Sequence, residues 1–343
     1  MMKYYFIGTD EAGYGPNLGP LLVSSSMWGA DFPATDDPLT LLNTRVLKSA
    51  GFKEGFRICD SKKIYHSGHL APLERSFYFA LESSLNQADD LPLFRQEEVL
   101  PPYYPSWLSV VHSISTAPQS ELKFSPPWEK EISFSLPLTG LQGWTERFPE
   151  DYSLTTSRLE SEGIHLLGIA SRRVQPHEFN IMLDRLKLKS ELLAEMTLET
   201  ALFLLRPVLD ECSEKKEILL CCDKLGGRNR YGDLLTRYFP QLKFEVEIES
   251  REVSVYRFPL SRGRMSVIFQ AKGESNIPTA LASIVSKYQR EISMIAFNRY
   301  WQMRKPDLAP TAGYPADAKR FRIETKDVRQ NEGIAEDCFW RKK

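Results

Sequence analysis

Short apolar runs that alternate with helical patterns predict a chain of mixed strands and helices. Residues 3–7 (KYYFI) are aromatic and β-branched, and a second apolar run follows at 21–26 after a loop rich in glycine and proline. The run at 218–222 (ILLCC) is wholly apolar, which is typical of a strand covered on both faces. Further strands are predicted at 163–173, 244–248, 253–258 and 265–269.

Helices are predicted where apolar residues recur at helical spacing. These segments are about 70–85, 178–209, 279–301 and 319–333. Pro207 should kink or end the second helix near its close, and Pro278 should open the third. Strands and helices mixed in this order predict an α/β protein with a mixed central sheet flanked by helices.

The stretch from about 91 to 162 has a different character. It is rich in proline, serine and aromatic residues, and its periodicity is poor, which indicates an inserted subdomain or an ordered set of loops. Its aromatic content argues against simple disorder. We therefore expect a core domain of residues 1–90 and 163–300, an insertion at 91–162 and a helical extension at 301–343.

Single residues in these outer regions allow two interpretations. Trp107, Trp128 and Trp144 of the insertion are either stacking platforms for a ligand or core aromatics, which is the commoner use. The final residues 341–343 (RKK) are expected to form a solvated tail.

Composition narrows the class of protein. The 343 residues carry a formal net charge of -1, so any nucleic-acid contact must come from local basic patches. There is no signal peptide and no apolar run of about 18 residues, which predicts a cytoplasmic protein without a membrane partner. The five cysteines have no CxxC pair and no histidine at metal spacing, so Cys221 and Cys222 are expected to be buried free thiols.

Acidic residues follow several of the predicted strands. Asp10 and Glu11 follow the first strand, Asp223 follows the run ILLCC, and Glu274 lies shortly after the last strand. Singly, such acids are more often turn or helix-capping residues. Together at strand ends they would repel one another unless a cation neutralised them, and hard oxygen ligands favour Mg²⁺ or Mn²⁺.

Four sequence segments resemble the type 2 ribonucleases H (ribonuclease HII) in the same order along the chain. DEAGYGPNLGP at 10–20 is similar to the family signature DEAGRGPxxGP, and CDSKKI at 59–64 to its DSKKL. ILLCCD at 218–223 and KGESNIPTALASIVSKYQRE at 272–291 resemble the two later blocks. The resemblance implies a ribonuclease H-like fold over roughly residues 3–70 and 163–320, with the insertion outside it.

The resemblance also implies site residues. Asp10, Glu11, Asp223 and Glu274 match the metal-binding and catalytic quartet, although the family has aspartate at the fourth position. Two Mg²⁺ or Mn²⁺ ions held there would activate water for phosphodiester hydrolysis. The register of Glu274 is chosen because it precedes Pro278 by the family's offset. If that register is wrong, Glu274 is a solvated acid at a helix start.

Substrate contacts are implied in the same way. The loop Gly13, Tyr14 and Gly15 matches the Gly-Arg-Gly loop whose backbone meets the ribose 2′-hydroxyl, with tyrosine in place of the arginine that clamps a phosphate. Tyr314, in the segment AGYPAD, matches the tyrosine that stacks on the sugar, or is a half-buried core aromatic. Lys62 and Lys63 of the DSKKL-like segment would contact phosphates, or are ordinary solvated surface. Lys224 and Arg228 lie in a basic glycine-containing loop after Asp223 that has no counterpart in the family; their position suits phosphate or leaving-group contact, or the loop is only a basic turn.

The function implied is a metal-dependent endonuclease. Its substrate would be an RNA–DNA hybrid or a DNA duplex containing ribonucleotides, with little base-sequence specificity. Two alternatives stay open. One is a nuclease of the same fold with a different nucleic-acid substrate, and the other is a nucleic-acid-binding protein whose site has decayed at the fourth carboxylate.

Overall fold

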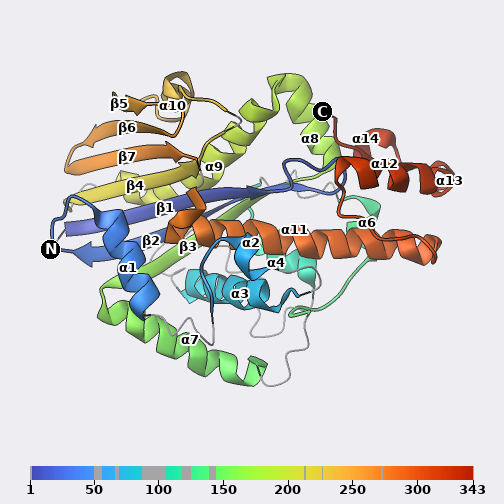
Figure 1. The fold of residues 1–343 in the computed structure, drawn as a ribbon, viewed down its shortest axis with the longest axis horizontal. Coiled ribbons are helices and arrows are strands. Elements are labelled where there is room, and N and C mark those ends of the chain that lie inside the picture. Colours follow the sequence, from blue (N-terminus) through green and yellow to red (C-terminus); the bar gives the residue numbers. More distant parts are fainter. Residues whose placement is uncertain are drawn as a thin grey trace.

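A single mixed β-sheet forms the centre of the computed structural model (Figure 1). The model describes residues 2–49, 56–65, 69–86, 106–117, 125–138, 144–211, 214–225, 227–271 and 273–342. Seven strands pair in the order β3-β2-β1-β4-β7-β6-β5. They are β1 (Met2–Ala12), β2 (Leu21–Phe32), β3 (Ile164–Val174), β4 (Lys216–Asp223), β5 (Glu245–Glu249), β6 (Val253–Leu260) and β7 (Gly263–Gln270).

The sheet combines parallel and antiparallel pairs. The strands β1, β4 and β7 run parallel to one another, while β2 and β3 on one side and β6 and β5 on the other are antiparallel to their neighbours. Parallel strands end at the same edge of a sheet, so the carboxyl ends of β1 and β4 lie side by side. The predicted α/β class with a mixed central sheet is confirmed.

Helices cover both faces of the sheet. The longest, α11 (Ile277–Arg304), packs on β1 and β2 from one side, and α9 (Lys189–Asp210) packs on β2, β3 and β1 from the other (Figure 1). The other described helices are α1 (Pro38–Ser49), α2 (Ser61–Ile64), α3 (Ala71–Asn86), α4 (Trp107–Ser113), α6 (Pro127–Glu131), α7 (Trp144–Ser161), α8 (Pro176–Leu186), α10 (Gly232–Tyr238), α12 (Pro315–Glu324), α13 (Lys326–Asn331) and α14 (Glu336–Phe339), with a 3₁₀ turn, η2 (Gly273–Ser275), before α11.

Side-chain alternation along β1 feeds two separate apolar cores. Tyr4 and Phe6 belong to the core on the α11 side, whereas Tyr5 and Ile7 belong to the core on the α9 side. This is the two-residue period of a strand buried on both faces. The same period decides which way the acidic residues at the end of β1 point.

Two predicted helices are wrong in their extent. The segment 178–209 is not one helix, because Lys187 adopts a left-handed conformation with φ 67° and ends α8 before α9 begins at Lys189. The segment 319–333 is also divided: Thr325 has φ −100° and ψ 6° and separates α12 from α13. Neither break carries a glycine or a proline, so apolar spacing alone continued across it. The helix α1 is not among the helices that the sequence predicted.

The described parts of the insertion pack on the same core as the rest of the chain. Trp107 of α4 and Trp128 of α6 are buried in the α11-side core, and α7 packs against β3. The core interpretation therefore holds for these two tryptophans, while the side chain of Trp144 lies outside the described residues. The limits proposed for the core domain, insertion and extension stay a prediction.

Among the described residues no helix combines the length and the apolar character needed to cross a membrane. Cys221 and Cys222 are buried free thiols in β4, as predicted.

Candidate active site at the carboxyl ends of β1 and β4

Asp10 and Glu11, the first two acids of the predicted quartet, are the third-last and second-last residues of β1. They do not lie beyond the strand, because it continues to Ala12. Asp10 is buried and Glu11 is partly buried. In the parallel pair Gly8 stands opposite Cys221 and Thr9 opposite Cys222, which brings Asp10 level with Asp223 at the end of β4.

Both aspartates point to the same face of the sheet. Phe6 of β1 and Leu219 of β4 face the α11-side core, and Asp10 and Asp223 follow each of them by an even number of residues. Alternation therefore directs the two carboxylates to the side of α11, next to one another, while Glu11 points to the α9 side. Two neighbouring carboxylates at a strand end are the arrangement that a divalent cation stabilises.

The start of α11 closes this corner from above. An added Cβ on Gly8 would lie 2.1 Å from the backbone nitrogen of Thr279, so only glycine lets the helix approach β1 so closely. Ser286 of α11 donates to the carbonyl oxygen of Asp10 at 3.0 Å. Gly8 and Ser286 thus let α11 pack closely beside Asp10.

The turn that carries Glu274 lies directly on Asp223. The backbone nitrogens of Lys224 and Gly273 donate to Oδ1 of Asp223 at 3.0 and 3.4 Å, which orients its carboxylate. Because Gly273 and Glu274 are consecutive in η2, the backbone of Glu274 follows directly on the residue that is hydrogen-bonded to Asp223. The side chain of Glu274 itself lies outside the described residues.

The described side chains of Asp10, Glu11 and Asp223 do not form a group of three whose ligand atoms all lie within 4.8 Å of one another. Carboxylates are ligands that suit Mg²⁺ or Mn²⁺. Metal binding by these residues and by Glu274 stays a prediction.

The glycine loop between β1 and β2 is held from below by two buried arginines. Gly13 has φ 91°, a conformation open to glycine, and its carbonyl accepts a 2.6 Å hydrogen bond from Nη2 of Arg341, which also donates to the carbonyl of Pro16. Arg290 of α11 donates to the carbonyls of Pro20 and Ala312 at 3.2 and 2.9 Å.

Arg341 corrects the prediction of a solvated tail. Its side chain is 1% exposed, and its guanidinium lies 5.0 Å from the ring centre of Phe179. Burial, and then the like charge of Arg290, lowers the pKa of Arg341. An RKK triplet near the end of a chain carries no signal for such burial, because the enclosing contacts come from residues more than 150 positions away.

Tyr14 and Tyr314 lie at opposite sides of the loop. The Tyr14 ring is partly buried on the α9 side, where the ammonium of Lys189 lies 5.0 Å from its centre and donates to its backbone carbonyl at 3.1 Å. Burial, and then the charge of Glu11, raises the pKa of Tyr14. Tyr314 is 55% exposed, and an added Cβ on Gly15 would lie 3.8 Å from its ring. An exposed ring over a glycine loop is not a core aromatic.

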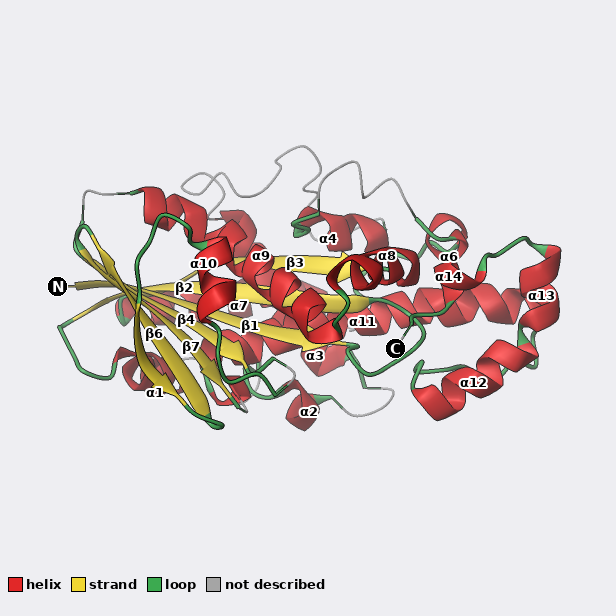
Figure 2. Cartoon of the chain, turned by 90° about the horizontal axis from the view of Figure 1, so that it is seen from above, coloured by secondary structure: helices red, strands yellow, loops and turns green. Residues whose placement is uncertain are grey.

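Lys62 and Lys63 are exposed on α2, which is fixed to the amino-terminal part of α11. Asp60 caps α2 by accepting from the backbone nitrogen of Lys62 at 2.9 Å, and the hydroxyls of Ser61 and Ser283 are 2.9 Å apart. Figure 2 shows α2 and α12 in the lower part of the view. The two lysines therefore stand on a support anchored to α11.

The other two predicted basic contacts are engaged inside the protein. The ammonium of Lys224 donates to the carbonyl of Ser250 and the hydroxyl of Ser254, both at 2.8 Å, and burial lowers its pKa. Arg228 forms an ion pair with Glu191 of α9. Both residues brace the loop after β4, so the geometry gives them a structural role, and substrate contact by either stays a prediction.

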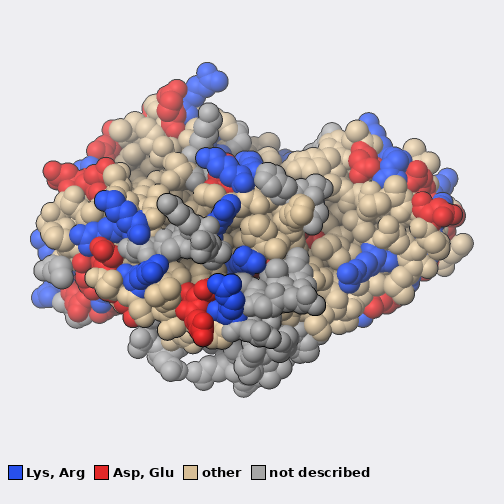
Figure 3. Space-filling model, turned by 60° about the horizontal axis from the view of Figure 1, so that its bottom comes forward, with Lys and Arg blue, Asp and Glu red and all other residues tan. Residues whose placement is uncertain are grey.

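Three residues beside the glycine loop were missing from the sequence-based site: Arg290, Arg341 and Lys189. Arg290 falls inside the segment 272–291 that resembles the family but shows no distinguishing spacing. Lys189 and Arg341 lie outside the four segments that carry the resemblance. Figure 3 shows Lys and Arg interspersed with Asp and Glu over the face drawn, in keeping with a net charge of -1.

Comparison with known proteins gives matches among solved structures, while no family model and no curated protein matches. A ribonuclease HII from Archaeoglobus fulgidus, solved in complex with PCNA, is 13% identical with a TM-score of 0.37, over 97% of this chain and 92% of that one. Ribonuclease H2 from Pyrococcus horikoshii is 13% identical with a TM-score of 0.37, over 98% and 92%.

A third match is Bst-RNase HIII in complex with Mn²⁺, 13% identical with a TM-score of 0.40, over 98% of this chain and 66% of that one. The three structures are of ribonucleases named HII, H2 and HIII, and the motifs of this sequence resemble those of ribonuclease HII. With identities and TM-scores this low, the likeness says nothing about activity, which has to be argued from the chain's own site.

Proposed function

We propose that this protein is a metal-dependent endonuclease that hydrolyses the RNA strand of RNA–DNA hybrids or cuts DNA duplexes at embedded ribonucleotides. The observation that carries the proposal is the pairing of Asp10 and Asp223 on one face of two parallel strands, with the turn of Glu274 bonded to Asp223. That end of β1 leads into a glycine loop in which Gly15 is exposed and has the Tyr314 ring beside it.

Asp10, Glu11, Asp223 and Glu274 would hold two Mg²⁺ or Mn²⁺ ions. When bound, such ions lower the pKa of a water and stabilise charge at the scissile phosphate. The protein's own part is to fix the carboxylates: backbone nitrogens orient Asp223, and α11 holds Asp10 through Ser286. Glu11, on the α9 side, would reach its ion around the end of β1.

Recognition of ribose would come from the loop and the exposed tyrosine. The backbone of Gly13 to Gly15 would meet the 2′-hydroxyl, the group that distinguishes RNA from DNA. Tyr314 would stack on the sugar from the opposite side, since its ring is exposed next to Gly15. Lys62 and Lys63 would contact phosphates and so position the strand without reading its sequence.

Lys189 supplies a cation where the family has an arginine at position 14. Its ammonium lies beside Tyr14 and binds the loop carbonyl, so a positive charge is kept at the loop although residue 14 has lost it. An ammonium acts on phosphate as a point charge, whereas a guanidinium grips two oxygens. We therefore include Lys189 among the phosphate contacts.

The decisive experiment compares two substrates and four proteins. A labelled DNA duplex with one ribonucleotide and a full RNA–DNA hybrid are incubated with Mg²⁺ or Mn²⁺ and with wild type, Asp10→Asn, Asp223→Asn or the control Asp31→Asn. Asp31 is an exposed acid opposite Lys3 at the other end of the sheet. Cutting by wild type and Asp31→Asn alone supports the proposal. Binding without cutting by all four would favour the decayed, nucleic-acid-binding alternative.

The fourth ligand needs its own series. If Glu274 binds metal, Glu274→Gln loses cleavage, whereas Glu274→Asp keeps a measurable part because the carboxylate remains. The neighbouring Ser275→Ala, in the same turn, should behave as wild type. Full activity in Glu274→Gln would show that the register placing Glu274 in the site is wrong.

The role of Lys189 is tested by salt dependence of hybrid binding without metal. Lys189→Met should make the slope of log K against log salt shallower by about 0.9, the value for one lost phosphate contact. Lys187→Met, an exposed lysine in the turn before α9, is the matched control. Equal slopes for the two variants would remove Lys189 from the phosphate contacts.

A further inference from the structure

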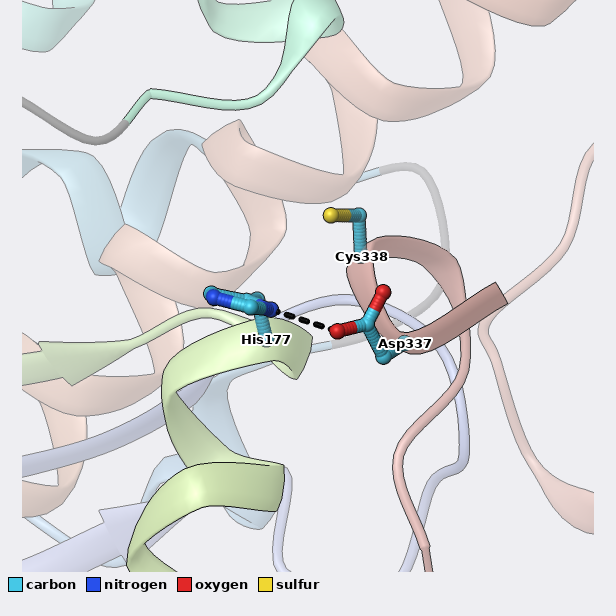
Figure 4. Close-up of side chains that lie close together, drawn as sticks. All are labelled: His177, Asp337 and Cys338. Carbon is cyan, nitrogen blue, oxygen red and sulfur yellow. Dashed lines mark hydrogen bonds and ion pairs between the residues drawn. The ribbon is translucent and has the colours of Figure 1, made fainter. Parts of the chain in front are cut away.

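A second group of side chains of the types that bind metals differs from Asp10 and Asp223 in its place in the sequence and in its mixture of ligand atoms. His177 of α8 and Asp337 and Cys338 of α14 bring one nitrogen, one oxygen and one sulfur atom within 4.8 Å of one another. Figure 4 shows the imidazole and the carboxylate pointing toward each other, with the thiol beside them on α14. Among the described residues, these three side chains are spaced closely enough to share one metal ion.

We propose that this group binds one transition-metal ion of the zinc class. Imidazole, thiolate and carboxylate are ligands that zinc accepts in tetrahedral sites, whereas Mg²⁺ takes oxygen ligands almost alone. Ligands at about 2.0–2.3 Å from a tetrahedral zinc lie about 3.3–3.8 Å apart. Nδ1 of His177 and Oδ2 of Asp337 are already 2.8 Å apart, so small side-chain rotations suffice.

A bound metal would replace the hydrogen bond between His177 and Asp337. Cysteine binds metal as the thiolate, so binding releases the proton of Cys338: the S–H bond breaks, a sulfur–metal bond forms, and the proton leaves to the buffer. Asp337 is exposed, so solvent can provide a fourth ligand.

No motif along the chain marks this site, because His177 and Asp337 are 160 positions apart. Cys338 has no histidine near it in the sequence, so the spacing of cysteines and histidines does not reveal the site. It is the packing of α14 on α8 that joins them. The same packing is supported by Asn180, whose amide donates to the carbonyls of Asp337 and Trp340 at 3.1 and 2.8 Å.

Metal binding would fasten the segment that carries Arg341. Lys342 donates its backbone N–H to Oδ1 of Asn180 at 2.8 Å, and Arg341 reaches from this segment to the carbonyls of Gly13 and Pro16. An ion shared by α8 and α14 would thus tie down residues 336–342 next to the glycine loop. This zinc-class site is separate from the proposed Mg²⁺ or Mn²⁺ site and stands without it.

Cobalt(II) is the direct probe. The full chain carrying Asp10→Asn and Asp223→Asn, which removes the carboxylate corner, is titrated with Co²⁺ and followed by absorption. We expect one equivalent to give the thiolate-to-metal charge-transfer band together with the visible bands of four-coordinate cobalt. A wild-type titration without a thiolate band would overturn the proposal.

Variants assign the band to this site. Cys338→Ser should abolish the charge-transfer band, and His177→Ala should weaken Co²⁺ binding by at least about 10- to 100-fold, the loss typical even of a group that only supports a ligand. Cys59→Ser is the control, because Cys59 is a partly buried free thiol outside the group. Persistence of the band in Cys338→Ser contradicts the assignment.

A measurement on the unmodified chain avoids any variant that fails to fold. Zn²⁺ should slow alkylation of Cys338, identified by peptide mass spectrometry, and leave alkylation of Cys59 unchanged. It should also slow amide hydrogen exchange over residues 336–342. Equal alkylation of Cys338 and equal exchange with and without Zn²⁺ would show that no ion closes this site.

Discussion

The two ends of the central parallel strand pair differ in how their charges are compensated. At the amino end, Lys3 pairs with Glu214 at 3.1 Å and Glu217 pairs with Arg264. At the carboxyl end, Asp223 has no ion pair among the described residues, and the adjacent Lys224 directs its ammonium to Ser250 and Ser254. The amino end is thus held by side-chain ion pairs, whereas at the carboxyl end Asp223 is held by backbone N–H groups.

The comparison teaches that charged groups are held in different ways at the two ends of the strand pair. Side-chain ion pairs hold the amino end, whereas backbone N–H groups orient Asp223 but carry no full charge to balance it. Variants at the two ends and added Mg²⁺ test this contrast.

The largest effect is expected on cleavage. Asp10→Asn and Asp223→Asn should each lower kcat by about 10³-fold or more, because a lost ligand removes several kcal/mol of charge stabilisation. Steady-state cleavage of a hybrid measures the loss. Asp31→Asn, at the opposite end of the sheet, should retain wild-type kcat, and a similar loss there would mean that the contrast between the ends has no functional basis.

Added Mg²⁺ should stabilise the protein through the carboxyl end of the strand pair β1 and β4. With Mg²⁺ at about 100 times its Kd, the free energy of unfolding of wild type should rise by about 2.7 kcal/mol. Asp223→Asn should gain little, because one of the two adjacent carboxylates is gone. Urea unfolding with and without Mg²⁺ gives both numbers. An equal gain in wild type and variant would place the ion elsewhere.

At the amino end of the strand pair, removal of a buried lysine charge should lower the stability of the protein. Lys216 of β4 is buried and its ammonium donates to the carbonyls of Val208 and Glu211 at the end of α9. Lys216→Met leaves two carbonyls unsatisfied and should cost about 1–3 kcal/mol of stability in urea unfolding. Cleavage per folded molecule should not change. Unaltered stability would show that these bonds contribute nothing net.

The smallest effect belongs to the exposed pair at the same end. Lys3→Met should cost under about 1 kcal/mol, since both partners are largely solvated. The hydrogen bond to Glu214 raises the pKa of Lys3 above its usual 10.5. The contribution is therefore fully present below pH 10.5 and is lost as the pH rises through the folded value. Urea midpoints at pH 7 and pH 11, compared with Glu214→Gln, check it.

Sequence reasoning predicted the sheet well for a physical reason. Strands such as β4 are short and wholly apolar, and the alternation in β1 is set by local pattern, so nearby residues carry the information. The helix breaks at Lys187 and Thr325 depend on backbone angles that neither residue type requires. They were missed because packing of the flanking helices selects them.

The candidate site divides in the same way. Asp10, Glu11 and Asp223 lie at the carboxyl ends of strands and were predictable from position, and family resemblance added Glu274, Tyr314 and the glycine loop. The supports of that loop were not predictable. Arg341 lies 328 residues from Gly13, and only the folded chain brings the two together.

That separation has a consequence for the order in which the protein is completed. The strands β1 and β2 and the loop between them are synthesised well before the arginine that supports the loop, which follows Gly13 by 328 positions. A chain interrupted before residue 336 keeps all four acids of the proposed quartet but lacks the brace beneath Gly13. Such a fragment would have metal ligands without a fixed surface for ribose, so premature termination would disturb the choice of substrate before it removed the chemistry.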